Sequence, residues 1–380
     1  MESDSEDTYF GYELGPIRPP SEAYSLLIRI TRNCHWNRCG FCPVYKNATF
    51  STRSISHITR DIDLISSYVE KLQAAGSLEQ FFEERSDFDL IDSAAYRSAV
   101  LWHNHGMKTV FLQDADSLVI PASDIIEILI HLRKRFPSIE RITTYARSST
   151  VAKISDDDMR TMGDAGLNRI HIGMESGSDN VLKMVRKGVS KDVHIRGGIK
   201  VLQAGIELSE YVMPGLGGVK YSEEHAIETA DALNQINPDF IRLRQLAIPE
   251  SVPLHTEMRE GRFKKLTDLE TIRELRLFIE NLEGINSRIV SDHVLNILPD
   301  IEGQLPDDKD RLISIIDSFL EMDLEKQLLY QLGQRMGVFR SLKDLEDSSK
   351  IAKVQVVFDK YRVTSENIDN LTSELMKRFI

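Results

Sequence analysis

The residues Cys34-His-Trp-Asn-Arg-Cys39-Gly-Phe-Cys42 hold all three cysteines of this 380-residue chain. An odd number of cysteines packed so closely cannot form a set of disulfides without strain and without leaving one thiol over. Three thiolates from one short loop suit a metal ion or an iron–sulfur cluster instead. In a cubane of four irons, three cysteines leave one iron open for a further ligand. The alternatives are a zinc site completed by His35 or a distant residue, and three buried cysteines packed by chance.

The cysteine loop directly follows a β-rich run, and beyond residue 108 such runs alternate with helical patterns. The expected strands are 24–31, 109–113, 141–145, 168–172, 207–213 and 239–244. Apolar residues at helical spacing predict helices over 54–76, 122–135, 179–187, 190–204 and 222–236. Ser155 and Thr267 carry the capping signatures of two more helices. Strands that alternate with helices favour a parallel sheet wound as βα units.

Six βα units predict an α/β fold, a partial (β/α)6 barrel of the TIM type, short of the eight units that close the full form. A flat doubly wound sheet is the alternative, but the glycine-rich dinucleotide turn is missing after the first strand. Three regions follow from this pattern: an irregular lead-in over 1–22, a barrel over 23–285 with a helical insertion at about 77–105, and a mainly helical extension over 286–380. We expect the extension to cover the open side of the barrel rather than fold as an independent module.

The composition is ordinary for a soluble globular protein, with 41% apolar and 28% charged residues. The net charge of −12 argues against a broad surface for nucleic acid. The first seven residues are acidic and polar, unlike a signal peptide, and no apolar run approaches the ~18 residues that span a bilayer. Because the thiols must stay reduced, we expect a cytoplasmic and oxygen-sensitive protein.

Three segments resemble the radical S-adenosylmethionine (SAM) superfamily. Ile30-Thr-Arg-Asn-Cys34 through Cys42-Pro43 resembles its cluster loop. Gly173-Met-Glu-Ser-Gly-Ser178 with Lys187-Gly188 resembles the fourth-strand segment of the branch that contains oxygen-independent coproporphyrinogen oxidase and the elongator-type tRNA enzymes. Tyr211-Val-Met-Pro-Gly-Leu-Gly-Gly218 resembles the fifth strand of that branch and its turn. The loop departs from the family pattern, because four residues rather than three separate the first two cysteines, and the extra residue must bulge.

The resemblance covers roughly residues 22–285 and implies the cofactors. Cys34, Cys39 and Cys42 would bind one [4Fe–4S] cluster, and the amine and carboxylate of SAM would fill the open iron. The reduced cluster would cleave SAM to methionine and a 5′-deoxyadenosyl radical that takes hydrogen from a substrate. No cysteine remains for a second cluster. We expect a small-molecule substrate of open identity and a reductase such as flavodoxin or ferredoxin as electron donor.

The carboxyl ends of the barrel strands, where such enzymes place their active sites, select the other site residues. Glu175 ends the fourth strand and would accept hydrogen bonds from the ribose hydroxyls. Asp114 or Asp116 would bind the amino group of SAM, and Arg147 would pair with its carboxylate. The predicted cofactor-binding residues are Phe41, Asp114, Asp116, Arg147, Ser148, Glu175, Ser176, Glu210, Met213, Gly215 and Arg244.

Each assignment has a structural alternative. The two aspartates could cap a helix before Pro121, and Arg147 could be a surface arginine. Arg242 and Arg244 could form a solvated edge of the sixth strand. Weaker candidates are His103, His105, His293 and Asn296. Two other classes of function also stay open: a haem- or tetrapyrrole-binding relative that has lost turnover, and a tRNA-modifying enzyme of the same superfamily, against which the acidic charge counts.

Overall fold

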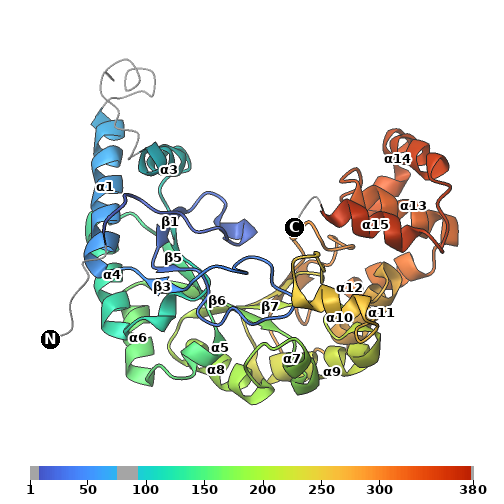
Figure 1. Cartoon of the computed structure of the whole chain (residues 1–380), viewed down its shortest axis with the longest axis horizontal. Coiled ribbons are helices and arrows are strands. Elements are labelled where there is room, and N and C mark those ends of the chain that lie inside the picture. Colours follow the sequence, from blue (N-terminus) through green and yellow to red (C-terminus); the bar gives the residue numbers. More distant parts are fainter. Residues whose placement is uncertain (1–7, 75–92, 378–380) are drawn as a thin grey trace. The chain divides into compact units, whose positions relative to one another are not determined.

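A computed structural model describes residues 8–74 and 93–377 of the chain and shows an α/β fold built around one long strand order (Figure 1). The order is β1-β4-β5-β6-β7-β8-β9-β10, and a separate hairpin pairs β2 with β3. The strands are β1 (Leu26–Arg29), β2 (Thr31–Arg32), β3 (Ser51–Thr52), β4 (Thr109–Gln113), β5 (Arg141–Ala146), β6 (Leu167–Glu175), β7 (Glu207–Val212), β8 (Phe240–Leu243), β9 (Arg288–Val290) and β10 (Gly303–Gln304).

Helices follow most of the strands, as a sheet of βα units requires. They are α1 (Ile55–Ala74), α3 (Ser93–Asn104), α4 (Ala122–Arg135), α5 (Ser148–Val151), α6 (Asp156–Asp164), α7 (Asp179–Met184), α8 (Lys191–Gln203), α9 (Gly218–Ile236), α10 (Pro253–Arg259), α11 (Asp268–Glu280), α12 (Lys309–Leu320), α13 (Leu324–Arg335), α14 (Ser348–Lys360) and α15 (Ile368–Met376). None of the helices in the described ranges is long and apolar enough to cross a membrane.

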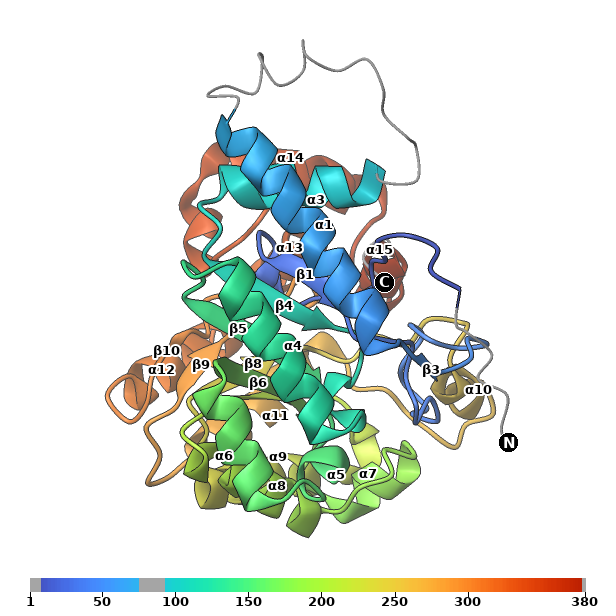
Figure 2. The same cartoon turned by 90° about the vertical axis from the view of Figure 1, so that its left-hand side faces the viewer.

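The chain forms two compact units, and the first takes in residues 1–37, 47–172 and 199–208. Its strands β1, β4, β5 and the start of β6 pair in parallel, with Leu26 opposite Val110 and Thr109 opposite Arg141. Helices α1 and α4 pack against each other and lie in front of β1, β4 and β5 in Figure 2. They bury one apolar face each, which makes the core of this unit: Ile58, Ile62 and Ile65 from α1, and Ile125, Ile128 and Leu132 from α4.

The second unit takes in residues 38–46, 173–198 and 209–380. Strands β7, β8 and β9 pair in parallel here, whereas β10 runs antiparallel to β9. Helix α11 packs against α9 and α12, and α13 packs against α14 and α15, the helices drawn in orange to red in Figure 1. Thr267 and Glu270 form a complete capping box at the start of α11, as their spacing predicts.

The predicted α/β class and its partial barrel of parallel strands are confirmed, with each of the six expected strands in place. The mainly helical C-terminal region is also confirmed, but it begins with two short strands, β9 and β10, that were not predicted. In the insertion expected at about 77–105, Ser93–Asn104 is helical, and the part up to residue 92 lies outside the described residues. The boundaries proposed for the three regions stay a prediction.

Candidate active site

The loop that carries the cysteines is held by backbone hydrogen bonds on both sides of Cys39. Within the first unit, the amide of Asn37 donates to Sγ of Cys34 over 3.4 Å. Within the second, the amide of Gly40 donates to the carbonyl of Val185 at 2.7 Å. The Gly40 carbonyl in turn accepts from the amide of Leu254 at 2.9 Å. The backbone around the second cysteine is therefore placed by the end of α7 and the start of α10.

The three thiols suit a cluster in their chemistry. None is in a disulfide; Cys39 is buried, and Cys34 and Cys42 are partly exposed. An amide hydrogen bond to a cysteine sulfur, such as the one at Cys34, is a contact that tunes iron–sulfur clusters. Across residues 8–74 and 93–377, no three His, Cys, Asp or Glu side chains stand together as ligands for a single metal ion. That finding concerns one ion, whereas each cysteine of a cubane binds a different iron.

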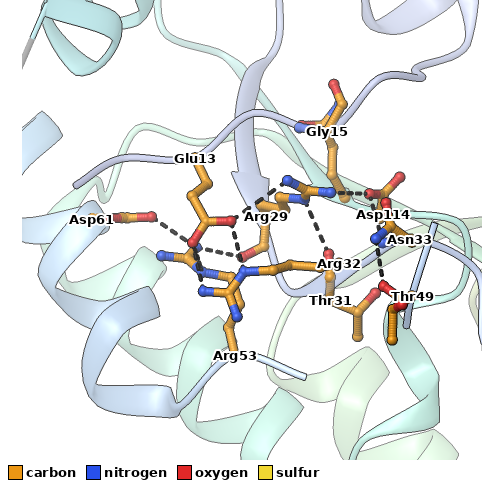
Figure 3. A network of polar contacts seen from close by, with 11 residues as sticks. Glu13, Gly15, Arg29, Thr31, Arg32, Asn33, Thr49, Arg53, Asp61 and Asp114 are labelled. Atoms are coloured by element: carbon orange, nitrogen blue, oxygen red, sulfur yellow. Dashed lines mark hydrogen bonds and ion pairs between the residues drawn. The ribbon is translucent and has the colours of Figure 1, made fainter. Parts of the chain in front are cut away.

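Asp114, predicted to bind the cofactor, makes its contacts inside the first unit (Figure 3). Its carboxylate accepts a hydrogen bond from Arg29 at 2.9 Å and one from the amide of Asn33 at 3.2 Å, and its side chain is fully buried. Asn33 immediately precedes Cys34. Asp114 is thus placed to hold the start of the cysteine loop, a role that sequence reasoning missed because it depends on which strand lies beside β4.

The lead-in before β1 is held by the same network. Glu13 accepts hydrogen bonds from Arg32 at 2.7 and 2.8 Å and forms an ion pair with Arg53 at 3.2 Å (Figure 3). Arg53 also binds Asp61 of α1 at 2.8 Å. Arg29 lies between the two carboxylates, Glu13 and Asp114. These ion pairs and hydrogen bonds therefore anchor the described part of the lead-in. Residues 8–19 form neither a strand nor a helix.

Asp116 lies in a second group of predicted residues in the first unit. The Thr150 hydroxyl donates to its carboxylate at 2.5 Å, and His35 Nδ1 lies 3.5 Å from the same oxygen. The guanidinium of Arg147 lies 5.2 Å from the ring centroid of Trp36, within the range of a cation–π contact. Arg147 is therefore largely buried rather than a surface arginine. Ser148, which follows it, is buried at the start of α5.

The buried Asp116 gives a testable pH dependence. Burial raises its pKa from 3.8 to about 7, so the folded chain keeps a proton that the unfolded chain releases above pH ~4. The free energy of unfolding should therefore fall between pH ~4 and ~7, by up to about 1.4 kcal/mol per pH unit from this group. Asp116→Asn should remove that contribution, which urea unfolding at a series of pH values measures. Asp157→Asn, on an exposed position of α6, is the control, and an unchanged slope in Asp116→Asn would contradict the assignment.

In the second unit, Glu175 forms an ion pair with Lys187 at the carboxyl end of β6. The Lys187 ammonium lies 3.2 Å from Oε1 of Glu175 and 5.9 Å from the ring centroid of Phe41. A Cβ at position 173 would lie 2.5 Å from Glu175 Oε1 and 3.0 Å from Lys187 Nζ, so Gly173 makes room for the pair. Glu175 itself has a φ of 65°, a left-handed conformation that is uncommon outside glycine. Lys187 was not predicted as a site residue, although Lys187-Gly188 belongs to the recognised motif.

Glu210 adds a second carboxylate from the neighbouring strand β7. It is fully buried, and no side chain in the described part of the chain donates a hydrogen bond to either of its oxygens, although a contact with the Met174 backbone lowers its pKa. Burial raises its pKa well above the ordinary value, while the charge of Lys187 lowers it and that of Glu175 raises it. Because a buried carboxyl group without a side-chain donor is costly, this group suits a ligand that donates hydrogen bonds.

The remaining predicted residues make contacts that shape the strand ends. The Met213 amide donates to the Glu175 carbonyl at 3.0 Å. Ser176 is buried, and its hydroxyl lies 2.8 Å from His225 Nδ1. Gly215 has a φ of 87°, and its amide donates to Glu274 at 2.6 Å. The Ser176 side chain is thus engaged inside the unit, and its role toward a cofactor stays a prediction.

The four weaker candidates from the sequence, Asn296, His293, His103 and His105, lie in different surroundings. Asn296 is buried with its side chain bonded to the Gln245 amide, the Leu243 carbonyl and the Ser291 hydroxyl. It therefore acts as a structural residue that joins β8 to the segment after β9. Burial and the charge of Arg244 lower the pKa of His293 to about 4. His103 and His105 lie at the end of α3 and in the turn that follows, before β4 begins.

A family model matches the part of the chain that holds the cysteine loop, Glu175 and Glu210, and this match decides the family. Residues 28–230, more than half of the chain, match the model of the Radical SAM superfamily. The chain belongs to the radical SAM superfamily. It is therefore an enzyme of this class, and its cofactors are the [4Fe–4S] cluster and SAM that the superfamily binds, as the cysteine loop predicts.

Two curated relatives resemble parts of this radical SAM enzyme. The tRNA uridine(34) acetyltransferase of Methanocaldococcus infernus is 23% identical over 119 residues, which are 31% of this chain and 22% of that protein. The CDK5RAP1-like protein of Oryza sativa subsp. japonica is 23% identical over 263 residues, which are 66% of this chain and 40% of that protein. The chain thus spans less than half the length of either relative.

Solved structures of the superfamily also align with this chain, at low identity. Coproporphyrinogen III oxidase from Escherichia coli aligns with 68% of this chain and 52% of its own, at 15% identity and a TM-score of 0.44. Elp3 from the archaeon Methanocaldococcus infernus aligns with 60% of this chain and 58% of its own, at 15% identity and a TM-score of 0.43. Likeness at this level says nothing about the substrate.

Proposed function

We propose that this enzyme cleaves SAM reductively and takes a hydrogen atom from a small molecule. When bound, the reduced cluster supplies the electron that splits SAM into methionine and a 5′-deoxyadenosyl radical. The observation that carries the proposal is the group formed by Glu175, Lys187 and Glu210 in the second unit, at the ends of β6 and β7. It lies beside Phe41, the residue next to Cys42.

The chemistry of this group fits the polar half of SAM. Both carboxyl groups can accept hydrogen bonds from the ribose hydroxyls, and no side chain among the described residues donates to either oxygen of Glu210. Lys187 pairs with Glu175, so it holds the side chain of Glu175 in one orientation. Gly173 leaves room for the ion pair, and Gly215 takes a left-handed backbone conformation at the turn after β7. The role of Glu175 in binding ribose is part of this proposal.

The location, the electron donor and the size of the substrate are proposed from the cysteine content and the net charge. A cytoplasmic location is part of the proposal, because three thiols that must stay reduced favour a reducing compartment. A flavodoxin or ferredoxin would deliver the electron, because the chain has no cysteine left for a second cluster that could relay it. The substrate would be a small molecule, since the net charge of −12 disfavours a long anionic partner.

The test is the formation of 5′-deoxyadenosine. After anaerobic reconstitution and reduction with dithionite, the enzyme should release methionine and 5′-deoxyadenosine in equal amounts. Glu175→Gln should keep the cluster but bind SAM about tenfold to a hundredfold more weakly, the usual loss when a charged hydrogen-bond partner is removed. Equilibrium binding of SAM measures this loss. Glu207→Gln, at the exposed amino end of β7, is the matched control.

Two outcomes would contradict the proposal. If the fully reconstituted enzyme forms no deoxyadenosine, a tetrapyrrole-binding relative without turnover becomes the better account, and a haem titration would test it. If Glu175→Gln binds SAM as the wild type does, Glu175 is structural and the ribose must be bound elsewhere.

A tRNA substrate is the second candidate, because one curated relative with similar sequence is a tRNA uridine(34) acetyltransferase. That likeness covers 31% of this chain, and the acidic charge counts against a surface for RNA. Filter binding of bulk tRNA at low salt separates the two candidates, since a tRNA enzyme should retain RNA that is released as salt rises.

A further inference from the structure

The lead-in ahead of β1 is attached through polar contacts. Its apolar side chains Phe10 and Leu14 are exposed, so these two add little to a core. Its backbone is instead bound by the side chain of Gln113, the last residue of β4. The amide of Gly15 donates to Oε1 of Gln113 at 2.8 Å, and Nε2 of Gln113 donates to the carbonyl of Ile17 at 2.8 Å. The lead-in is therefore fixed at the carboxyl end of β4.

Glu13 of the lead-in is a carboxylate that three arginines share (Figure 3). Arg32 donates to both of its oxygens, at 2.7 and 2.8 Å, while Arg53 lies 3.2 Å from one oxygen and Arg29 lies 3.5 Å from the other. The arginines come from β1, from β2 and from the residue after β3. Burial raises the pKa of Glu13, but the three arginines outweigh it and keep this pKa below its ordinary value. Glu13 thus joins β1 to the hairpin of β2 and β3 as a charged group.

The chain leaves this hairpin at the start of the cysteine loop. Arg32 ends β2, and Asn33 and Cys34 follow it directly. Asn33 has a φ of 69°, in the left-handed region, and its Nδ2 donates to the carbonyl of Thr49 at 2.6 Å. The positions of Arg32 and Asn33 therefore set the direction in which the chain reaches Cys34.

Two routes connect Glu13 to the start of the loop. One follows the chain, because Glu13 binds Arg32 with both oxygens. The other crosses from β1 to β4: Glu13 pairs with Arg29, and Arg29 donates to Asp114 at 2.9 Å. Asp114 in turn accepts a hydrogen bond from the amide of Asn33 at 3.2 Å. The side chains of Arg29 and Asp114 are 13% and 0% exposed, so water screens this pair little.

We propose that Glu13 is a positioning residue for the cluster: it holds the start of the cysteine loop in the conformation in which Cys34 binds iron. A loop that is fixed in advance loses less conformational freedom when its thiolates bind. The interval from Cys34 to Cys39 is one residue longer than the family pattern, and that extra freedom is what such a hold restricts. Glu13 lies before residue 28, so it is not part of the segment that matches the superfamily.

Alkylation of the cysteines by iodoacetamide in the cluster-free full-length chain tests this role. Cys34 is partly exposed, and its labelling should rise with the population of opened loop conformations. Trypsin cuts after Arg38, which separates Cys34 from the other two cysteines, so mass spectrometry of the peptides reads the rate at each site. Cys42 is the internal reference, because it belongs to the second unit and the contacts of Glu13 lie in the first.

In Glu13→Gln, we expect the ratio of the labelling rate at Cys34 to that at Cys42 to rise about tenfold, because a charged hydrogen-bond partner is lost. Gly15→Ala should raise the same ratio by about threefold. Its added Cβ would lie 3.1 Å from Cγ of Asp114 and displace that side chain. Gly15→Ala changes no charge, so a rise shared by both variants reports the conformation of the loop rather than the field of the arginines.

Asp61→Asn is the matched control for a merely stabilising role. Asp61 binds Arg53 at 2.8 Å in the same network and is more deeply buried than Glu13, but it lies on neither route to Cys34. Asp61→Asn should therefore lower the stability in urea at least as much as Glu13→Gln and leave the labelling ratio unchanged. Glu140→Gln, in an exposed ion pair, should change neither quantity.

An unchanged ratio in Glu13→Gln, or a rise as large in Asp61→Asn, would overturn the proposal. If Glu13→Gln does not fold, Gly15→Ala decides by the same criterion. With the cluster in place, the Glu13→Gln enzyme should release iron to the chelator bathophenanthroline about tenfold faster than the wild type, and an equal rate would also overturn the proposal. Because the labelling needs neither cluster nor SAM, its result does not depend on whether the enzyme forms deoxyadenosine.

Discussion

Replacing any one of Cys34, Cys39 and Cys42 by alanine should remove the iron–sulfur cluster and all formation of 5′-deoxyadenosine. The chain has no other cysteine, so no second thiol can take over. The wild type should hold about four irons and four sulfides per chain after anaerobic reconstitution. Each variant should lose this iron together with the visible absorbance of the cluster. Iron and sulfide analysis and a deoxyadenosine assay on the same samples measure both losses.

His35→Ala is the control that separates the cluster from a zinc site. A zinc ion bound by the cysteines and completed by His35 would be lost in this variant, whereas a cluster held by three thiolates would keep its iron. The variant keeps all three thiols, and it removes the contact of His35 with Asp116 at 3.5 Å. Stoichiometric zinc in protein purified without oxygen, or a clean second cluster in EPR spectra, would contradict the assignment of one cubane.

The six longer strands could be predicted from sequence because each is a short run of mostly apolar residues, as a strand buried in a parallel sheet requires. In β4, four of the five residues are buried, and the same holds for the central residues of β6. Strands β9 and β10 have three and two residues, too few to show a period, and they form because Phe240 pairs with Arg288 and Gly303 with Ile289. Helix α14 was predicted only as part of the mainly helical extension, and its valines favour a strand as much as a helix.

Candidate site residues could be named from sequence where the residue type itself suggests the chemistry. They could not be assigned a role where that role depends on which residue lies beside them in the fold. The cysteine loop and the end of β6 were found from their own residues. Asp114 was expected to bind the cofactor, and its pairing with Arg29 became visible only once β1 was seen beside β4. Glu210 was found from its place at a strand end, but its lack of a side-chain donor in the described residues is a property of the packed strand. The assignments to individual atoms of SAM stay predictions.

Replacing Arg335 by methionine should be the most destabilising single change outside the cysteine loop. Arg335, at the end of α13, is buried, and its Nη2 donates to Asp268 at 2.6 Å. Its Nη1 also donates to the Leu295 carbonyl at 2.6 Å. Burial alone would raise the pKa of Asp268, but the charge and hydrogen bonds of Arg335 outweigh it and keep this pKa lowered. The variant leaves Asp268 charged, buried and without its main partner, which costs about 3–5 kcal/mol.

Urea unfolding of the full-length chain measures this cost, and the pair Arg276–Asp317 provides the control. That pair joins α11 to α12 with an N–O distance of 2.6 Å, but both side chains are about one-third exposed. Arg276→Met should therefore lose only about 0–1 kcal/mol. Adding Asp268→Asn to Arg335→Met should restore part of the loss, because it removes the unpaired charge.

The result also decides whether residues 286–380 fold as a module of their own. Arg335 and Leu295 lie after residue 286, whereas Asp268 and Gln245 lie before it, so this buried network crosses the boundary proposed from sequence. If the extension is part of one cooperative unit, Arg335→Met should shift a single unfolding transition that includes β8 and α11. If the variant instead shows two unfolding transitions, and the part of the chain before residue 286 keeps wild-type stability, the extension folds alone.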